Sequence, residues 1–561
     1  MNGTQDQYVH RSIDSPHGLK VIVVGAGISG ILNAIKLPRL VEKLDLVIYE
    51  ENGGLGGTWL ENRYPGIACD IPAHMYQLSW DSNVAWSHYY ASGHEILDYW
   101  RRVAQKYDVE KYMKFSSRVK EARWVAREAQ WVVTIEDVAT GQVVQDRSDA
   151  LITAYGALNS WDWPQIPGLA KFKGSLMHSA KWDESFDLDG KTVAVIGAGS
   201  SGIQIVPSIQ PKVRRIDHYV RGRTWIASPM ASQELERRGV REGNFTYPLE
   251  EIAKWKSDPQ AYLSYRKQIE TFAQSGHEIT LRGSQAQAIA RAHFTNLMTE
   301  RLCKKPELLP HFLPSFSPLC RRLTPGPGYL EALTEENVEV VVSPISKVNE
   351  TGIVTSDGKQ RDVDAIVCAT GFNATFANIV PIYGVNGKQL FDRPDGTRPR
   401  TANYLSIGVD GFPNMFIILG PNSAVGAGNL LMIMERAVDY TARALRKMQL
   451  ENILTMQPSV HAVNNFTKFV DVHHHRTVYG EDCTSWYKAD GRVTALWPGS
   501  SLHAIKALEN PRWEDFTYVY RDENETGWLG DGSTLADWNP EGDKSYYLTS
   551  AELITDAPKS V

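Results

Sequence analysis

The sequence predicts an α/β fold with two Rossmann-like dinucleotide-binding domains and a helical insert. Three observations lead to this prediction. Two apolar, β-branched strands each run into the pattern G-x-G-x-x-G, and a long charged segment of helical character follows the second. A strand that ends in such a turn and opens a helix is typical of dinucleotide-binding domains. A chain of 561 residues is also too long for one hydrophobic core.

The first glycine turn contains Gly25, Gly27 and Gly30. In this motif the first glycine makes the turn, the second lets the backbone approach a pyrophosphate, and the third permits close packing of helix on strand. The next strand ends at Glu50, where an acid would bind a ribose diol. Together these features predict a first dinucleotide site.

The second glycine turn comprises Gly197, Gly199, Ser200, Ser201 and Gly202. The strand after it ends in Arg221 instead of an acid. A guanidinium at that place would pair with a 2′-phosphate, which a carboxylate would repel. The sequence therefore favours NADPH over NADH at this site. The ordinary alternative is a surface arginine at the end of a strand.

Two longer motifs narrow the prediction. The spacing F-x-G-x-x-x-H-x-x-x-W-[PD] is filled by Phe172, Gly174, His178, Trp182 and Asp183. The spacing G-x-W-x-x-x-x-[FY]-P-G-x-x-x-D is filled by Gly57, Trp59, Tyr64, Pro65, Gly66 and Asp70. Both resemble signatures of the type I (class B flavoprotein) Baeyer–Villiger monooxygenases. The long C-terminal tail and the stretch C-R-R-L-T-P-G-P-G-Y resemble their fungal polycyclic-ketone subgroup. The structural alternative for the first motif is a linker pinned by two aromatics, with His178 bonded to a backbone carbonyl.

The resemblance implies FAD in the first domain and NADPH in the second. The implied FAD contacts are Glu50, Gly57, Thr58, Trp59, Asp70 and Tyr76, with Val119 beside the adenine ring. The structural alternatives are core packing for Trp59 and Tyr76, and a helix cap or turn acid for Asp70. The resemblance also implies that Trp486 meets the nicotinamide ribose, for which ordinary aromatic packing is the alternative.

The resemblance assigns catalysis to an arginine ahead of a G-Y-x-E helix, a position that Arg322 fills. Its guanidinium would face the flavin and be oriented by Asp70. The neighbouring Arg321 is a candidate second contact to the 2′-phosphate. Which of the two arginines faces the flavin is left open by the sequence.

The implied reaction consumes NADPH and O2. A C4a-peroxyflavin attacks a ketone, bulky or polycyclic in the fungal subgroup, and gives an ester or lactone. A flavin-dependent N- or S-oxygenating monooxygenase is the main alternative, because it shares both glycine turns. A disulfide reductase would need a C-x-x-C dithiol, which the sequence lacks. A non-catalytic flavin-binding protein would be expected to lose Arg322 or Asp70.

The motifs divide the chain into three parts. We expect an FAD-binding domain at 1–158 and 382–561, an NADPH-binding domain at 159–228 and 318–381, and a helical insert of the latter at 229–317. The insert and the loop 424–427 carry no cofactor motif and flank the expected cleft. They are therefore expected to determine the range of substrates.

Composition limits partners and location. The net charge of −6 argues against nucleic acid or an anionic membrane as a partner. No apolar run is long enough to span a membrane, and the first twenty residues are too polar for a signal peptide, so we expect a cytoplasmic protein. The five scattered cysteines predict neither a zinc site nor a disulfide. The adjacent His473, His474 and His475 cannot face one ion, so no metal is expected. The oligomeric state is left open.

Overall fold

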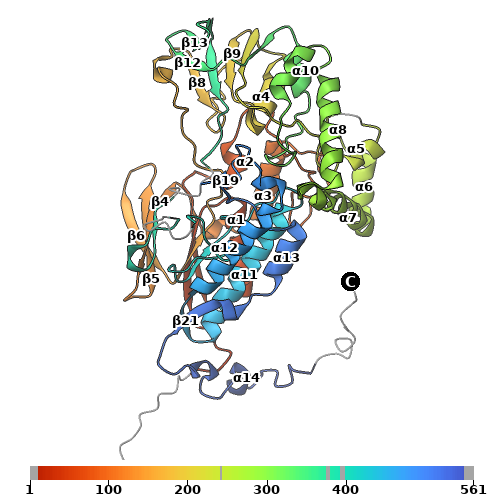
Figure 1. The fold of residues 1–561 in the computed structure, drawn as a ribbon. Helices are drawn as coiled ribbons and strands as arrows, with labels where there is room; N and C mark the ends of the chain where they lie inside the picture. Colours follow the sequence, from red (N-terminus) through yellow and green to blue (C-terminus); the bar gives the residue numbers. More distant parts are fainter. Residues whose placement is uncertain (1–10, 241–242, 374–379, 392–398, 549–561) are drawn as a thin grey trace, which may run out of the picture.

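The computed structural model describes residues 11–240, 243–373, 380–391 and 399–548. Two five-stranded sheets, in which every strand pairing is parallel, form its two main bodies (Figure 1). Helices pack beside both sheets, as expected for parallel sheets that are buried on both faces. The predicted α/β class is confirmed.

The first sheet combines strands from both ends of the chain. Its order is β17-β7-β1-β2-β3. These strands are Met415–Ile417, Ala150–Thr153, Leu19–Val24, Leu44–Tyr49 and Met113–Lys114. Because a strand near residue 415 completes a sheet that begins at residue 19, the first body is discontinuous in sequence.

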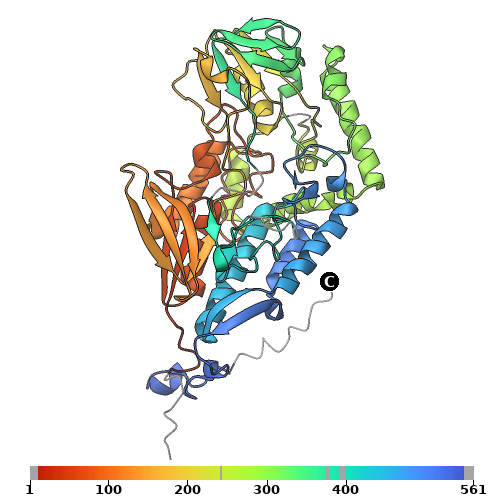
Figure 2. The same cartoon turned by 60° about the vertical axis from the view of Figure 1, so that its left-hand side comes forward.

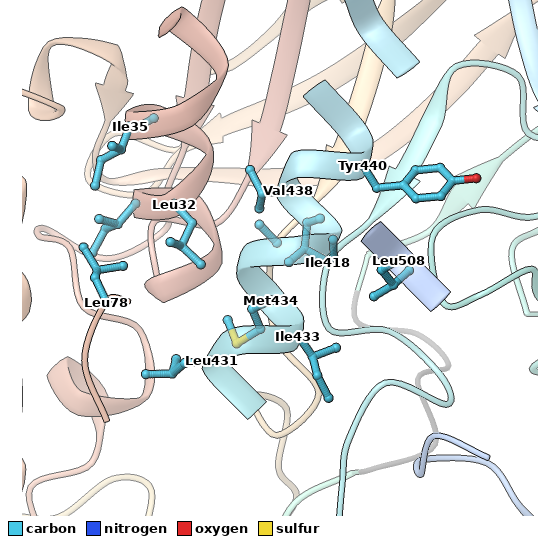
Figure 3. Close-up of a cluster of buried hydrophobic side chains, with 14 of the residues drawn as sticks. Leu32, Ile35, Leu78, Ile418, Leu431, Ile433, Met434, Val438, Tyr440 and Leu508 are labelled. Carbon is cyan, nitrogen blue, oxygen red and sulfur yellow. The ribbon is translucent and has the colours of Figure 1, made fainter. Parts of the chain in front are cut away.

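Two helices meet on this first sheet, and their contact anchors the core. Helix α1 (Ile28–Leu40) and helix α11 (Leu430–Leu450) lie side by side. Figure 3 shows Leu32 and Ile35 on α1 in the same buried cluster as Met434 and Val438 on α11, with Leu32 on the side of α1 that faces α11. All four side chains are at most 5% exposed. This packing holds the start of α1, and with it the first glycine turn, against the C-terminal half of the chain.

The second sheet has the order β11-β10-β9-β15-β8. These strands are Val338–Val341, Arg215–Tyr219, Thr192–Ile196, Ala365–Cys368 and Ser175–His178. The last of them, β8, follows Phe172 and Gly174 of the F-x-G-x-x-x-H motif, ends at its histidine and forms one edge, with His178 opposite Cys368. The motif is thus part of the second nucleotide-binding body.

Smaller elements complete the framework. A four-stranded sheet has the order β16-β4-β5-β6 (Ile382–Tyr383, Ser117–Val125, Gln130–Asp137, Val143–Ser148), in which β16 pairs with β4 in parallel and the other pairings are antiparallel. A three-stranded antiparallel sheet has the order β12-β13-β14 (Ile345–Val348, Gly352–Thr355, Gln360–Asp362). Two antiparallel pairs are β18-β21 (Ile453–Pro458, Phe516–Tyr520) and β19-β20 (Lys488–Ala489, Arg492–Val493). The remaining helices outside the insert are α2 (Thr58–Glu61), α3 (Gly93–Lys106), α4 (Ser200–Ile209), α10 (Tyr329–Thr334), α12 (Val460–His475), α13 (Ser501–Glu509) and α14 (Leu535–Trp538).

The segment expected to be a helical insert is helical, and it joins both bodies (Figure 2). Its helices are α5 (Gln233–Arg237), α6 (Leu249–Ser257), α7 (Pro259–Gln274), α8 (Gln285–Arg301) and α9 (Leu309–Phe312). Trp255 and Tyr265, on α6 and α7, pack into the core of the first body around His74, whereas Phe294 and Met298 on α8 belong to the core of the second. The insert therefore bridges the two nucleotide-binding bodies. The exact domain boundaries stay a prediction.

Within the described part of the chain, no helix combines the length and the apolar character that crossing a membrane requires. Residues 1–10, on which half of the signal-peptide prediction depends, lie outside the described part.

Candidate active site

A cavity of about 630 Å³ lies at the carboxyl end of the first sheet. The last residues of two of its strands, Val24 of β1 and Tyr49 of β2, form part of the wall. Open parallel sheets bind their ligands at this edge. Nine of the residues predicted to bind cofactor also line it: Gly25, Gly27, Glu50, Gly57, Thr58, Trp59, Tyr76, Val119 and Trp486.

The glycines bring backbone against backbone in this wall. Gly57 has a φ of +52°, and a Cβ there would lie 2.9 Å from the Cα of Gly27. A Cβ on Gly30 would lie 2.1 Å from the carbonyl oxygen of Gly25, so only glycine lets α1 start this close to β1. The start of α1 has no side-chain cap on its N–H groups. This end of the cavity therefore presents free backbone donors, as a pyrophosphate requires.

Glu50 is fixed beside these donors. Its carboxylate is 6% exposed and accepts hydrogen bonds from the backbone N–H groups of Ala26 (2.7 Å) and Asn52 (2.8 Å). Burial raises the pKa of Glu50, while these hydrogen bonds oppose the rise. The Asn52 side chain also bonds both Glu50 and Glu61, and the two acids line the same cavity. A carboxylate held in this way can still accept hydrogen bonds from a diol.

Trp59 and Tyr76 form one wall of the cavity and contact each other. The Trp59 indole N–H donates to the Tyr76 hydroxyl at 3.0 Å, and the two rings meet edge to face. Trp59 and Tyr76 therefore pack against each other and also face the cavity. Which groups of a bound cofactor they contact stays a prediction.

Asp70 and Arg322 form a bidentate ion pair across 252 residues of sequence. The Arg322 Nη2 lies 2.7 Å from both carboxylate oxygens, and its Nε lies 3.0 Å from Oδ2. The attraction of Asp70 raises the pKa of Arg322, although burial opposes it. Neither residue lines the 630 Å³ cavity, but both charges act on the buried Tyr76 hydroxyl in its wall. The pair thus lies next to the Tyr76 side of the cavity.

The two adjacent arginines point to different places. The Nη1 of Arg321 donates to the backbone carbonyl of Arg223 at 2.9 Å, in the second body. Burial and the nearby Arg221 lower the pKa of Arg321. Arg321 therefore gathers with Arg221, while Arg322 pairs with Asp70. Of the two, Arg322 is therefore the arginine that lies next to the first cavity.

The second glycine turn repeats the geometry of the first. Gly197 has a φ of +111°, and a Cβ on Gly202 would lie 2.1 Å from its carbonyl oxygen. Helix α4 begins at Ser200, again without a side-chain cap, and the space next to Gly199 is open. Ser201 occupies the first turn of that helix. The turn therefore leaves free N–H groups for a second pyrophosphate.

The prediction that the cysteines form no disulfide is wrong. Cys320 and Cys483 form one, with Cα atoms 6.4 Å apart. The bond joins the segment that precedes Arg322 to the loop that contains Trp486. Because the two cysteines are 163 residues apart, no local motif marks them as partners. Cys69, Cys303 and Cys368 are free.

His178 does not make the hydrogen bond to a backbone carbonyl that its alternative, structural role would require. It contacts Trp161 instead, a residue that no sequence motif marks. The Nδ1 of His178 accepts the Ala180 N–H at 3.1 Å, and its Nε2 lies 3.3 Å from the Thr370 hydroxyl, so the partners are a backbone amide and a hydroxyl and not a carbonyl. Its ring stacks on Trp161 with centroids 4.3 Å apart and planes at 7°. Trp161 in turn lines the cavity, so the motif supports the cavity through this indole. Burial lowers the pKa of His178 to about 4.

Other cavity residues also lacked a sequence signal. Among them are apolar or aromatic residues from distant segments, such as Tyr155, Leu419, Leu431 and Met434. Their only mark in the sequence is apolar character, which they share with the core. Across the residues that the structure describes, no group of three or more His, Cys, Asp or Glu is placed to hold a metal ion.

Comparison with known proteins agrees with this geometry. Residues 18–238 match the family described as flavin-binding monooxygenase-like. The chain is 36% identical over 541 residues to the FAD-binding monooxygenase tazF of Aspergillus terreus, covering 95% of each chain. It is 33% identical over 492 residues to a Baeyer–Villiger monooxygenase of Streptomyces coelicolor, covering 86% of this chain and 89% of that one. Cyclohexanone monooxygenase from Rhodococcus sp. Phi1, bound to NADP+, matches with a TM-score of 0.76 and 26% identity, covering 90% of this chain and 100% of the other.

Proposed function

This chain belongs to the flavin-binding monooxygenase-like family, and from that membership we propose that it is a Baeyer–Villiger monooxygenase, which uses FAD, NADPH and O2 to convert a ketone into an ester or lactone. The observation that carries the proposal is the bidentate Asp70–Arg322 pair beside the cavity of the first dinucleotide site. The F-x-G-x-x-x-H-x-x-x-W-D motif, whose histidine supports the wall of that cavity through Trp161, is a second support.

The residues of the first site fit an FAD. Gly27 and the uncapped start of α1 would hold its diphosphate, and Glu50 would bind its ribose. Gly57 lets the chain approach closely enough for this, and Trp59 and Tyr76 would face the flavin side. When bound, FAD supplies the redox chemistry and the activation of O2. The protein contributes binding, orientation and the exclusion of water.

The second site fits NADPH. The free N–H groups at Gly199 and Ser200 would hold the diphosphate. Arg221 and Arg321 would bind the 2′-phosphate together, since the two guanidinium groups lie close to each other. Trp486 would cover the nicotinamide side, from a loop that already reaches the first cavity.

Arg322 would act as the fixed positive charge of the reaction. A guanidinium that is oriented before the reaction stabilises negative charge on a substrate oxygen with little reorganisation. Asp70 would orient this fork and limit how strongly it attracts an anion. The side chains of the pair are 30% and 23% exposed, which leaves room for a ligand to reach the guanidinium.

We also propose a bulky or polycyclic ketone as the substrate. The loop 424–427 is built from small residues between the first cavity, which Ala424 lines, and the insert, where Gly276 faces Ala427. A Cβ on Gly426 would meet the Tyr479 hydroxyl at 1.9 Å, so larger residues there would displace this wall. At the cavity itself the small side chain of Ala424 leaves more space for a large ring system than a bulkier residue would. The cytoplasmic location stays a prediction.

A product screen tests the proposal. The FAD-loaded protein would be given cyclic, aryl and steroid ketones with NADPH, and each ester or lactone would be measured against NADPH consumption. Amines and sulfides form the second arm. Ester formation from the larger ketones is the expected result. Oxygenation of amines or sulfides without any ester would refute the Baeyer–Villiger assignment and favour an N- or S-oxygenase.

A further inference from the structure

The Cys320–Cys483 disulfide joins the two halves of the site. Cys320 lies two residues before Arg322, and Cys483 lies three residues before Trp486. Arg322 is the proposed positive charge next to the substrate, and Trp486 is the proposed cover of the nicotinamide. One covalent bond therefore joins the segments that contain them. Cys320 is fully buried, whereas Cys483 is only half-buried, so Cys483 is the end of the disulfide that lies nearer to solvent.

A lysine lies against both sulfurs. The Lys488 Nζ is 3.4 Å from the Cys483 Sγ and 3.6 Å from the Cys320 Sγ. It is held there by the backbone carbonyls of Glu481 and of Cys483, the latter at 3.2 Å. An ammonium group beside a sulfur stabilises a thiolate, which is both the leaving group when a disulfide is cleaved and the nucleophile when it forms again.

Non-covalent contacts on either side of Cys483 limit the part of the loop whose position depends on the disulfide. Before it, the Glu481 carboxylate accepts hydrogen bonds from the Ser317 N–H (3.1 Å) and hydroxyl (2.8 Å). After it, Tyr487 is fully buried, and its carbonyl accepts the Thr494 N–H at 2.8 Å. Residues 482–486, which contain Trp486, span these two anchors, and the disulfide is the covalent tie between them.

We propose that Cys320–Cys483 is a site of reversible reduction by a dithiol, and that its redox state sets how tightly residues 482–486 cover the nicotinamide nucleotide. This inference rests on the proposed role of Trp486. In the oxidised protein the loop is tied to the Arg322 segment. In the reduced protein the five residues keep only non-covalent contacts, such as those of Ser485 and of the Trp486 ring, so the cover opens more often and NADP+ is retained less well.

The exchange balances without any other reactant. One thiolate of the dithiol attacks the Sγ of Cys483, and Cys320 leaves as a thiolate beside Lys488. The second thiol of the reductant then attacks the mixed disulfide and releases Cys483. The protein gains two electrons and two protons, which convert its disulfide into two thiols, and the reductant loses the same number and becomes a disulfide. Oxidation by a disulfide of the same class reverses each step.

The first experiment counts thiols. The FAD-loaded protein is denatured with iodoacetamide, before and after treatment with dithiothreitol, and its intact mass is measured. Because three of the five cysteines are free, three adducts are expected before reduction and five after it. Reduction of Lys488→Met should be roughly tenfold slower, since its thiolate loses the ammonium group. Five adducts without dithiothreitol would overturn the proposal.

The second experiment measures the loop. Hydrogen exchange of the peptide that spans 482–486 should become about tenfold faster on reduction, because the disulfide no longer restrains local opening of the loop. NADP+ should bind roughly threefold to tenfold more weakly, since a tether that favours the bound geometry is lost. Cys483→Ser should behave like the reduced protein and not respond to dithiothreitol. Cys303→Ser, which removes an exposed free cysteine elsewhere, should behave like the wild type.

Two results would overturn the switch even if the disulfide forms. One is unchanged exchange and unchanged NADP+ affinity on reduction of the wild type, a test that needs no variant to fold. The other is an equal response of Cys483→Ser to dithiothreitol, which would assign the effect to another group. Neither measurement involves a ketone. Failure of the oxidised protein to form ester would therefore refute the proposed function separately.

Discussion

Replacement of Arg322 by alanine should nearly abolish ester formation, while FAD binding and flavin reduction by NADPH persist. At a charge separation of about 4 Å and an effective dielectric constant of about 20, the Arg322–Asp70 attraction is on the order of 4 kcal/mol. A substrate oxygen that reaches the same guanidinium meets a similar field, partly offset by Asp70. One oriented donor of this kind contributes about 3 kcal/mol to a transition state, or roughly a hundredfold in rate. Arg322→Lys should fail almost as severely, because it keeps the charge but loses the planar fork.

The assay compares Arg322→Ala with Arg321→Ala. Stopped-flow absorbance follows flavin reduction, and product analysis follows the ester. Arg321→Ala should keep ester formation but weaken NADPH binding, because its guanidinium lies near Arg221 and not near Asp70. If Arg321→Ala lost ester formation and Arg322→Ala kept it, the assignment would be wrong by one residue. If both variants formed ester at a near-normal rate, no arginine in this segment would stabilise the reaction.

Three further predictions concern binding and selectivity. Gly57→Ala should release FAD, because its Cβ would lie 2.9 Å from the Cα of Gly27 at a φ of +52°, whereas Gly53→Ala, with nothing within 4 Å, should keep the normal flavin absorbance of the purified protein. Arg221→Ala should weaken NADPH binding by roughly tenfold or more and leave NADH nearly unchanged; an equal loss for both nucleotides would contradict the 2′-phosphate assignment. Ala424→Phe should change ketone preference or regiochemistry while flavin reduction stays normal, and identical selectivity across the ketone panel would refute its place in the substrate wall.

The parts that the sequence predicted well are those in which local chemistry dictates local geometry. A glycine that must accept a positive φ, such as Gly25 or Gly197, marks its turn wherever it occurs. Apolar β-branched runs next to these turns predict buried parallel strands, and both sheets contain them. Glu50 at the end of β2 follows from the same unit. Each of these inferences needed fewer than thirty consecutive residues.

The parts that could not be predicted depend on how distant segments meet. Nothing in the sequence around Cys320 indicates which of four other cysteines lies opposite, because that depends on how the loop 481–488 folds back. Trp161 looks like any aromatic residue in an extended segment until His178 stacks on it. The direction of Arg321 and Arg322 is set by partners in different bodies, Arg223 and Asp70, so identical adjacent residues could not be distinguished.

Because the first sheet is discontinuous in sequence, the two sheets can close only at different stages of synthesis. All five strands of the second sheet lie between residues 175 and 368, so that sheet can close once its own stretch of chain has left the ribosome. The first sheet must wait for β17 at Met415–Ile417, which pairs with β7. Until then the edge of β7 is open, and an unpaired strand edge is a template for wrong pairing and aggregation. Chains that terminate between these two points would carry a finished second domain and a first domain with an exposed edge, so the last third of the protein is needed to protect its beginning.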